Sequence, residues 1–373
     1  MRLADSLTCE MLTRRLLGKS SWAGWGLPLL LYVALALAWT LPVGVAHGAL
    51  LGLGLNDQVG DPIQKAWSVA WIPFALGHGL NPAYTSYLHA PVGINYLWPP
   101  PDILYNLAVW PITAAWGVAR GFDAEIALGI VTSAFCFYLL ARRWTRNAWL
   151  ATLAGAMFGF SPYIASEVVM GHSYLVEVAA IPLLAIAVDE ILIQQRWRAR
   201  SSGILLGTAA TIQAVTSEEL LFDCVIIGVL AILVLLLLNG RPSRERIHYV
   251  GRCTVWALPF TSILLALIGY QFFGPGALHE YSFPAALWDA SPVSFILPGA
   301  QQLISTSASS HLVEWSVWGL PEVSTYLGLP MLVALLIGLW RMRDRTTAFL
   351  GIMLAVSMII AMGFSSAWPG AST

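Results

Sequence analysis

The chain has 373 residues, of which 58% are hydrophobic and only 10% are charged, and its formal net charge is −1. Soluble globular domains carry about 25% charged residues, so water cannot be the only solvent of this chain and a purely soluble class of protein is excluded. The four cysteines are scattered without CxxC or Cys/His spacing, so the sequence supports neither a disulfide framework nor a zinc site.

Apolar stretches of transmembrane length recur along the whole chain. A transmembrane helix needs about 20 predominantly apolar residues, because lipid offers no partner for unpaired backbone groups. Stretches that qualify or nearly qualify are 27–46, 125–141, 148–162, 174–193, 203–217, 221–238, 250–272, 324–340 and 346–364. We therefore predict an all-α polytopic membrane protein, a bundle of about nine or ten transmembrane helices. A cytoplasmic tail is expected at 1–24 and one multi-span membrane domain at 25–373.

The first apolar stretch follows Arg14, Arg15 and Lys19, as the core of a signal peptide does. The run at 27–45 is longer than the about 7–15 residues of such a core, and further apolar stretches follow it. An uncleaved signal-anchor helix is therefore favoured over a cleaved signal peptide. Both interpretations give the first stretch the same orientation.

The segment 102–119 is apolar as well, but Pro111 interrupts it. We expect Pro111 to break this segment, which then forms a re-entrant or interfacial helix rather than a full crossing. The alternative of ten crossings would place later arginine-rich loops on conflicting sides of the membrane. The two long outer loops are then expected at 47–124 and 273–323.

Arginines fall in every second connection between the apolar stretches, at 142–146, 196–200, 241–246 and 341–345. This positive-inside pattern predicts a cytoplasmic N-terminus. With that topology, 17 of the 19 basic residues lie inside, whereas 14 of the 20 acidic residues lie outside with only Lys65 and Arg120. Acidic residues contribute little to orientation. The outer excess of carboxylates therefore indicates that any chemistry belongs to the outer face.

The first outer loop carries Asp57 and Asp61. Asp61 precedes Pro62, a helix-start signal, and Lys65 follows four residues after Asp61, so helix capping and catalysis are both open for Asp61. Asp57 has no obvious helix to cap, and a carboxylate close to the bilayer surface suits a general base acting on an acceptor hydroxyl. A solvated loop residue is the alternative for Asp57.

Aromatic residues follow Asp61 at helical spacing. Trp67, Trp71 and Phe74 stand at i, i+4 and i+7 and would form one stripe on a helix. An aromatic stripe beside a membrane usually marks a helix that lies in the interface. We therefore expect an interfacial helix in the first outer loop.

A second set of ionisable residues follows the third apolar stretch, which Pro162 ends. Glu167 and His172 are therefore expected at or outside the outer interface. Glu177 is expected inside the next apolar stretch, where an ionisable group is by default a functional-site hypothesis because its burial is costly without a partner. A structural hydrogen bond between helices is the alternative for Glu177.

A short hairpin joins the fifth and sixth stretches and contains Glu218, Glu219 and Asp223. Glu219 and Asp223 are four residues apart and would share a helix face. Like charges that close would raise the pKa of one carboxyl group or recruit a cation. A functional role is favoured over a purely structural turn.

Several short motifs resemble those of the GT-C superfamily of membrane glycosyltransferases. They are Asp57-x-x-x-Asp61-Pro62, Trp67, Trp71-x-x-x-Ala75-Leu76, Asn81-Pro82, Ala90-Pro91-x-Gly93-x-Asn95, Ser161-Pro162-Tyr163, Gly171-His172, and Glu322 before Tyr326-Leu327-Gly328. The group includes protein O-mannosyltransferases, oligosaccharyltransferase catalytic subunits and lipid A aminoarabinose transferases. The resemblance implies a multi-span helical fold, catalysis on the extracytoplasmic side and a polyprenyl-phosphate or polyprenyl-diphosphate sugar as donor.

The resemblance also implies roles for individual residues. An acidic residue of the first outer loop is central in the group, and this role falls on Asp57 or Asp61. Glu167 and His172 would form a second site near the next outer loop. A leaving phosphate needs positive charge in the transition state. Either Lys65 supplies it, or Mg²⁺ or Mn²⁺ does so, with Asp57, Asp61 and Glu167 as the expected metal ligands.

The leading hypothesis is a plasma-membrane glycosyltransferase that moves a hexosyl or pentosyl group from a polyprenyl-phosphate donor to a glycan, lipid or protein acceptor on the extracytoplasmic face. Lys65, Glu167, His172, Glu218 and Glu219 are the expected substrate contacts. No nucleic-acid partner is expected. The alternatives are a transporter or flippase of lipid-linked precursors and a non-catalytic membrane relative. Members of the group usually continue beyond this length, so a minimal or C-terminally truncated relative is expected.

Overall fold

The computed structural model describes residues 22–47, 60–98, 101–277, 290–300, 302, 304–316, 325–342 and 344–363. Within these ranges the fold is all-α apart from one antiparallel pair of two-residue strands, which confirms the all-α part of the predicted fold class. Each predicted apolar stretch lies largely in helix. The chain forms two compact units: the first contains 1–159, 171–221 and 243–279, and the second contains 160–170, 222–242 and 280–373.

The elements of the first unit are α2 (Trp22–His47), α3 (Gly60–Gly77), β1 (Tyr84–Thr85), β2 (Ile94–Asn95), α4 (Ile103–Trp116), α5 (Val118–Ala141), α6 (Ala148–Gly159), α8 (Ser173–Val176), α9 (Ala180–Val188), the π-helical turn η1 (Asp189–Gln194), α10 (Ala199–Thr216) and α12 (Arg244–Phe273). The second unit contains α7 (Pro162–Met170), α13 (Ser307–Ser316), α14 (Leu329–Arg341) and α15 (Arg345–Ala361). Helix α11 (Glu218–Asn239) begins in the first unit and continues in the second.

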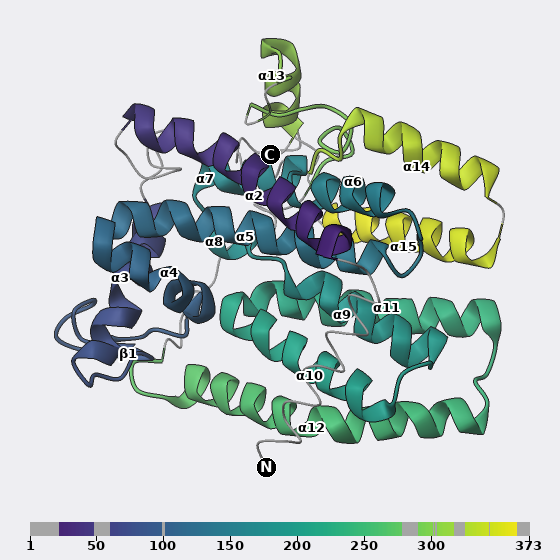
Figure 1. Cartoon of the computed structure of the whole chain (residues 1–373), viewed down its shortest axis with the longest axis horizontal. Coiled ribbons are helices and arrows are strands. Elements are labelled where there is room, and N and C mark those ends of the chain that lie inside the picture. The colour runs from purple at the N-terminus through teal and green to yellow at the C-terminus, as the bar shows by residue number, and fades with distance from the viewer. Residues whose placement is uncertain are drawn as a thin grey trace, which may run out of the picture. The chain divides into compact units, whose positions relative to one another are not determined.

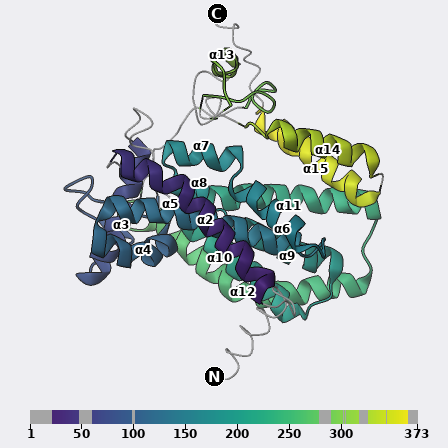
Figure 2. The ribbon, with the colours of Figure 1, turned by 45° about the horizontal axis from the view of Figure 1, so that its top comes forward.

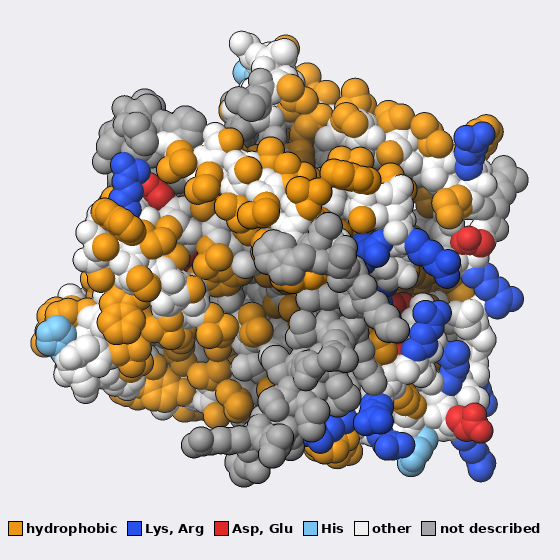
Figure 3. Space-filling view, in the orientation of Figure 1, with side chains coloured by type: hydrophobic (Ala, Val, Ile, Leu, Met, Phe, Trp, Pro, Cys, Tyr) orange, Lys and Arg blue, Asp and Glu red, His pale blue; other side chains and the backbone are white. Residues whose placement is uncertain are grey.

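Among the described residues, five helical segments are long and apolar enough to cross a bilayer. They are Gly24–Leu41, Val118–Ala141, Ala148–Met170, Glu218–Asn239 and Arg244–Phe273. Their outward side chains are apolar: Leu237 is 84% exposed and Phe273 is 89% exposed. Hydrophobic side chains also dominate the visible surface over α2 and α4 (Figure 3). Such exposed apolar surface is compatible with a membrane protein rather than a soluble one.

Helix α5 is the central helix of the first unit and packs against α2, α4, α6 and α9 (Figures 1 and 2). Small residues allow the close approach of α6. Gly155 and Gly159 of α6 face Ala134 of α5, and a Cβ at Gly155 would lie 2.6 Å from the Ala134 carbonyl oxygen. Tyr32 of α2 donates a hydrogen bond to the carbonyl oxygen of Thr152 at 2.8 Å. Small residues four apart are a common means of packing helices in membranes.

Gly155→Val is expected to lower the free energy of unfolding by about 2–3 kcal/mol, because overpacking forces backbone shifts when the obstructing atom is itself backbone. Gly251→Val on α12 is the matched control, since a Cβ at Gly251 would meet no atom within 4 Å. The measurement is unfolding of both purified variants in detergent. Equal stability of the two variants would contradict the tight α5–α6 contact.

The structure corrects the expected role of Pro111. Helix α4 runs through Pro111 and ends at Trp116, so the prediction that Pro111 breaks this segment is wrong. The chain turns instead at Gly117, whose φ of 86° lies in the left-handed region that favours glycine. Proline removes one backbone hydrogen bond, and the packing of α4 against α3 and α5 holds the helix together across that gap. With 14 residues, α4 is shorter than the about 20 residues that cross a bilayer.

The structure also divides the predicted stretch 174–193. It forms α8, α9 and η1 in place of one continuous helix. Glu177 lies in the break after α8, with φ of −82° and ψ of 56°, so the prediction that Glu177 lies inside a continuous helix is wrong. The side chain of Ser133 on α5 fills the gap: its hydroxyl donates to the carbonyl oxygen of Val176 at 3.0 Å and accepts from the amide of Val178 at 3.1 Å.

The second unit has its own small core. Phe295 and Val313 are buried there with Ala290, and Met358 of α15 packs against them. The Ala290 amide donates to the carbonyl oxygen of Ala361 at 2.8 Å, which ties this segment to α15.

Candidate functional site

A buried ion pair connects α3 to the start of α4. Lys65 Nζ lies 3.0 Å from Asp102 Oδ2, and the two side chains are only 2% and 1% exposed. Asp102 precedes α4 with φ of 45°, and its side chain does not cap that helix. The left-handed backbone turns this carboxylate away from the helix N-terminus and toward Lys65. An ion pair excluded from water to this degree is costly to break.

Two neighbours support the ion pair. The hydroxyl of Ser173 on α8 donates to Asp102 Oδ2 at 3.4 Å. The ammonium group of Lys65 also lies 4.3 Å from the centre of the Tyr174 ring, a cation–π contact. Burial raises the pKa of Asp102 to about 6, although Lys65 and Ser173 both favour the ionised form.

Glu125 of α5 and Glu177 bring two further carboxyl groups into this region. Each is 1% exposed, and within the described part of the chain neither carboxyl oxygen of Glu177 has a hydrogen-bond partner. Both interact electrostatically with Asp102 and with Lys65. Gly129 makes room for Glu177, because a Cβ at Gly129 would lie 3.0 Å from Glu177 Cγ. One ammonium group therefore interacts electrostatically with three buried carboxyl groups.

Asp61 provides the water-accessible part of the site. Its side chain is 51% exposed, and His172 Nε2, which is buried, lies 3.4 Å from Asp61 Oδ2. The hydrogen bond with His172 lowers the pKa of Asp61 against a smaller opposing effect of burial. Asp61 lies in the first turn of α3, one turn before Lys65. The structure therefore brings together three residues that the sequence analysis proposed: Asp61, Lys65 and His172.

The predicted aromatic stripe positions α3. The rings of Trp67 and Trp71 stack at 5.2 Å with an interplanar angle of 11°, and Trp71 contacts Phe74 at 6.1 Å. Trp71 Nε1 also donates to the carbonyl oxygen of Pro82 at 3.0 Å. Tyr96, which follows β2, is fully buried against Trp67. These contacts hold the helix that carries Asp61 and Lys65 against the loop of β1 and β2.

The predicted acidic hairpin lies at the start of α11. Gln271 Nε2 of α12 donates to Glu218 Oε1 at 3.0 Å, and Glu218 also interacts electrostatically with Lys65 and Asp102. Glu218 is thus a peripheral member of the same site. Glu219 and Asp223 are exposed on α11.

Two further candidate residues are Glu167 and Asp57. Glu167 is 4% exposed on α7 and belongs to the second unit. Asp57 lies outside the described residues. Among the residues that the structure describes, no group of three or more His, Cys, Asp or Glu side chains has an arrangement that could hold a metal ion. The assignments to Asp57, Glu167 and a metal therefore stay predictions.

Most of the described arginines of the first unit lie at or near the other end of its helices, Arg120 being an exception. Glu125 and Ala141 are about 24 Å apart along α5 at 1.5 Å per residue. Just beyond Ala141, Arg143 Nη2 pairs with Asp189 Oδ2 at 2.8 Å and with Glu190 Oε2 at 2.6 Å. Figure 3 shows basic side chains over the region where α12 begins. The first unit thus has an arginine-rich end and an acidic end, as the charge pattern of the sequence predicts.

The sequence analysis missed Asp102, Glu125 and Ser173 as site residues. Glu125 carried a usable signal, because it begins an apolar stretch and an ionisable group there is unusual. Asp102 and Ser173 gave no such signal, since their roles depend on long-range contacts with α3 and α4.

Fold and site together define an all-α protein with long apolar helices, compatible with a membrane, and with a buried carboxyl–lysine site at one end of its first unit. Comparison with protein-family models, with curated protein sequences and with solved structures finds no match to this chain.

Proposed function

We propose that this chain is a plasma-membrane glycosyltransferase that moves a sugar from a polyprenyl-phosphate donor to an acceptor on the extracytoplasmic face. One observation carries the proposal: a half-exposed carboxylate, Asp61, is held by the buried His172 one helical turn from the buried Lys65–Asp102 pair. An exposed and ionised carboxylate fixed by a buried partner suits a general base. The short motifs shared with GT-C enzymes agree with this role.

In the proposed reaction, the acceptor oxygen attacks the anomeric carbon of the donor sugar and forms a new C–O bond. The bond between that carbon and the phosphate oxygen breaks, and the polyprenyl phosphate leaves with the electron pair. The acceptor proton passes to a carboxylate oxygen of Asp61. The configuration at the anomeric carbon is inverted in this single displacement.

The developing charge on the leaving phosphate needs compensation. Lys65 lies one turn from Asp61, but its ammonium group is already paired with Asp102 and buried. Lys65 therefore acts on the phosphate through the electrostatic field of its ammonium group. Its ion pair with Asp102 also fixes the position of α3. Because the described carboxylates do not form a metal site, no step is assigned to Mg²⁺ or Mn²⁺. Comparing sugar transfer with and without EDTA tests separately whether Mg²⁺ or Mn²⁺ is needed.

The orientation is part of the proposal. The arginine-rich end of the first unit is placed in the cytoplasm, because basic residues flanking membrane helices are retained there. The acidic end, with Asp61, then faces the opposite side. An acceptor glycan, lipid or protein would approach from that side.

The transporter alternative has one observation in its favour. The chain is broken between α8 and α9 beside two buried carboxyl groups, Glu125 and Glu177, and broken helices beside buried ionisable groups are common in transporters. The test below separates the two functions.

The test uses membranes that contain the full chain, supplied with radiolabelled polyprenyl-phosphate mannose or polyprenyl-phosphate arabinose. We expect label to move from the donor to a lipid, glycan or protein fraction. Asp61→Asn is expected to reduce this transfer at least about 100-fold, whereas the control Glu245→Gln, at the exposed start of α12, is expected to retain it. Translocation of the intact donor without transfer would contradict the enzyme and favour the transporter.

A further inference from the structure

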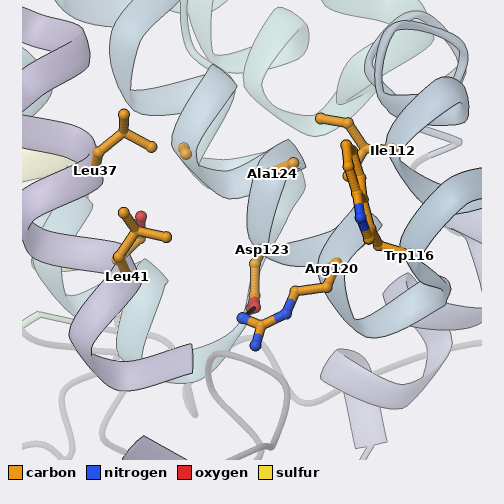
Figure 4. A pocket seen from close by; sticks show the side chains of 9 residues that line it. Leu37, Leu41, Ile112, Trp116, Arg120, Asp123 and Ala124 are labelled. Carbon is orange, nitrogen blue, oxygen red and sulfur yellow. Dashed lines mark hydrogen bonds and ion pairs between the residues drawn. The ribbon is translucent and has the colours of Figure 1, made fainter. Parts of the chain in front are cut away.

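An apolar slot lies between α2, α4 and α5 (Figure 4). Its volume is about 370 Å³, at the lower end of the range for ligand pockets of about 300–1,000 Å³. Leu37 and Leu41 of α2 form one wall, and Ile112 and Trp116 of α4 form the opposite wall. Ala127 of α5 leaves the floor open. The helices α2 and α5 are themselves of membrane-crossing length and composition.

One end of the slot is polar. Arg120 and Asp123, from the first turns of α5, line this end, and Arg120 Nη1 lies 3.5 Å from Asp123 Oδ2. The Arg120 side chain is 44% exposed, whereas that of Asp123 is 14% exposed. A guanidinium group has five N–H donors, and this long contact uses one of them. Arg120 can therefore bind an anion at the mouth of the slot.

The position of Arg120 is unusual in this chain. Apart from Lys65, it is the only basic residue that the topology predicted from the sequence places on the side opposite the arginine-rich loops. Trp116, which is 70% exposed, lies beside it, and Trp and Arg side chains at the end of a membrane helix mark the headgroup level of a bilayer. A hydrocarbon chain in the slot would thus place an attached phosphate at Arg120.

The phosphate would also lie near the candidate site. Arg120 and Glu125 are about 7.5 Å apart along the axis of α5. Gly121, next to Arg120, packs so closely against Val69 that a Cβ there would lie 2.8 Å from Val69 Cγ1. Val69 is on α3, the helix that carries Asp61 and Lys65. The mouth of the slot, on α5, and the proposed base, on α3, are therefore carried by two helices in direct contact.

We propose that this slot binds one hydrocarbon chain of a lipid phosphate, with the phosphate on Arg120, and that this lipid is the carrier of the donor sugar. The second half of this inference rests on the proposed function. The volume of the slot suits part of one hydrocarbon chain, and Arg120, the one cation among its lining residues, fits one anionic headgroup. Asp123 competes with the phosphate for Arg120 and limits the affinity.

The test is direct binding to the full purified chain in dodecyl maltoside, measured by native mass spectrometry. The probes are a polyprenyl phosphate, the corresponding uncharged polyprenol, and phosphatidylglycerol. We expect the polyprenyl phosphate to bind one-to-one and at least about tenfold more tightly than the other two, because charged hydrogen bonds to phosphate are strong. Arg120→Gln should weaken this binding about tenfold, and Asp123→Asn should strengthen it about threefold.

A size variant tests the walls independently of charge. Ala127→Phe fills the slot and should weaken polyprenyl phosphate binding about tenfold, whereas Leu30→Phe, at a position of α2 that is 59% exposed and outside the slot, should leave it unchanged. If neither Arg120→Gln nor Ala127→Phe changes the affinity for polyprenyl phosphate, the slot is not the lipid site, even if sugar transfer persists. Equal binding of phosphatidylglycerol would overturn the assignment to the carrier lipid. Slot-dependent binding without any transfer would leave the slot in place and contradict the proposed function.

Discussion

Lys65→Met is expected to lower the free energy of unfolding by about 3–5 kcal/mol, because it leaves a buried carboxylate without its counter-charge. Lys65 and Asp102 are almost fully excluded from water, and Glu125 and Glu177 add two more buried carboxyl groups nearby. No other described basic side chain contacts Asp102. The loss of a single ammonium group therefore leaves all three carboxyl groups without a buried cation.

The double variant Lys65→Met/Asp102→Asn separates lost charge pairing from lost packing. It is expected to recover most of the lost stability, since a buried pair can often be replaced by uncharged groups at little cost. Arg252→Met, at an exposed position of α12, is the control and should change the free energy of unfolding by less than about 0.5 kcal/mol. Equilibrium unfolding in mixed detergent and SDS micelles measures all three. A double variant as unstable as Lys65→Met would contradict the ion-pair explanation.

Asp61→Asn is expected to reduce the rate of sugar transfer by about 10²–10⁴-fold, the usual contribution of a general base. The amide is of similar size but cannot accept the proton of the acceptor hydroxyl. Because Asp61 is half-exposed, its replacement should leave the unfolding transition close to that of the wild type. Asp57→Asn is measured in parallel. A large loss with Asp57→Asn and none with Asp61→Asn would transfer the base role to Asp57.

His172→Gln tests whether His172 sets the pKa of Asp61. His172 lowers the pKa of Asp61 by hydrogen bonding, so its removal should raise this pKa toward the ordinary range of an aspartate. A base acts only when it is ionised, and the acid limb of the pH–rate profile should therefore move to higher pH. A lower rate with an unshifted acid limb would show that His172 has only a structural role.

Much of the fold can be predicted from the length of the apolar stretches and from the residues that separate them. The stretches 27–46 and 203–217 match α2 and α10 closely, because long apolar runs have few alternatives to helix in lipid. The breaks are harder to predict. Pro111 is accommodated within α4, and the turn falls at Gly117, a residue that is common in membrane helices and gives little local signal.

The site could be predicted only in part. Asp61, Lys65 and His172 were recognisable from the spacing of polar residues beside apolar stretches, and they do meet. Asp102 is different, because its left-handed backbone and its contact with Lys65, 37 residues away in sequence, arise from packing. Local patterns do not encode such contacts. Once the structure shows that Lys65 is buried, a buried counter-charge is expected, because buried charges in proteins are paired.

The sidedness of the first unit decides whether Asp61 can serve an outer acceptor. Val92, between β1 and β2 at the acidic end, is 71% exposed, and Glu245 is exposed at the arginine-rich end. Each is replaced by cysteine in a variant whose four native cysteines are changed to alanine, and intact cells are treated with a membrane-impermeant maleimide. We expect Val92→Cys to be labelled in intact cells and Glu245→Cys only after permeabilisation. Labelling of Glu245→Cys in intact cells, with Val92→Cys protected, would place Asp61 in the cytoplasm and contradict transfer on the outer face.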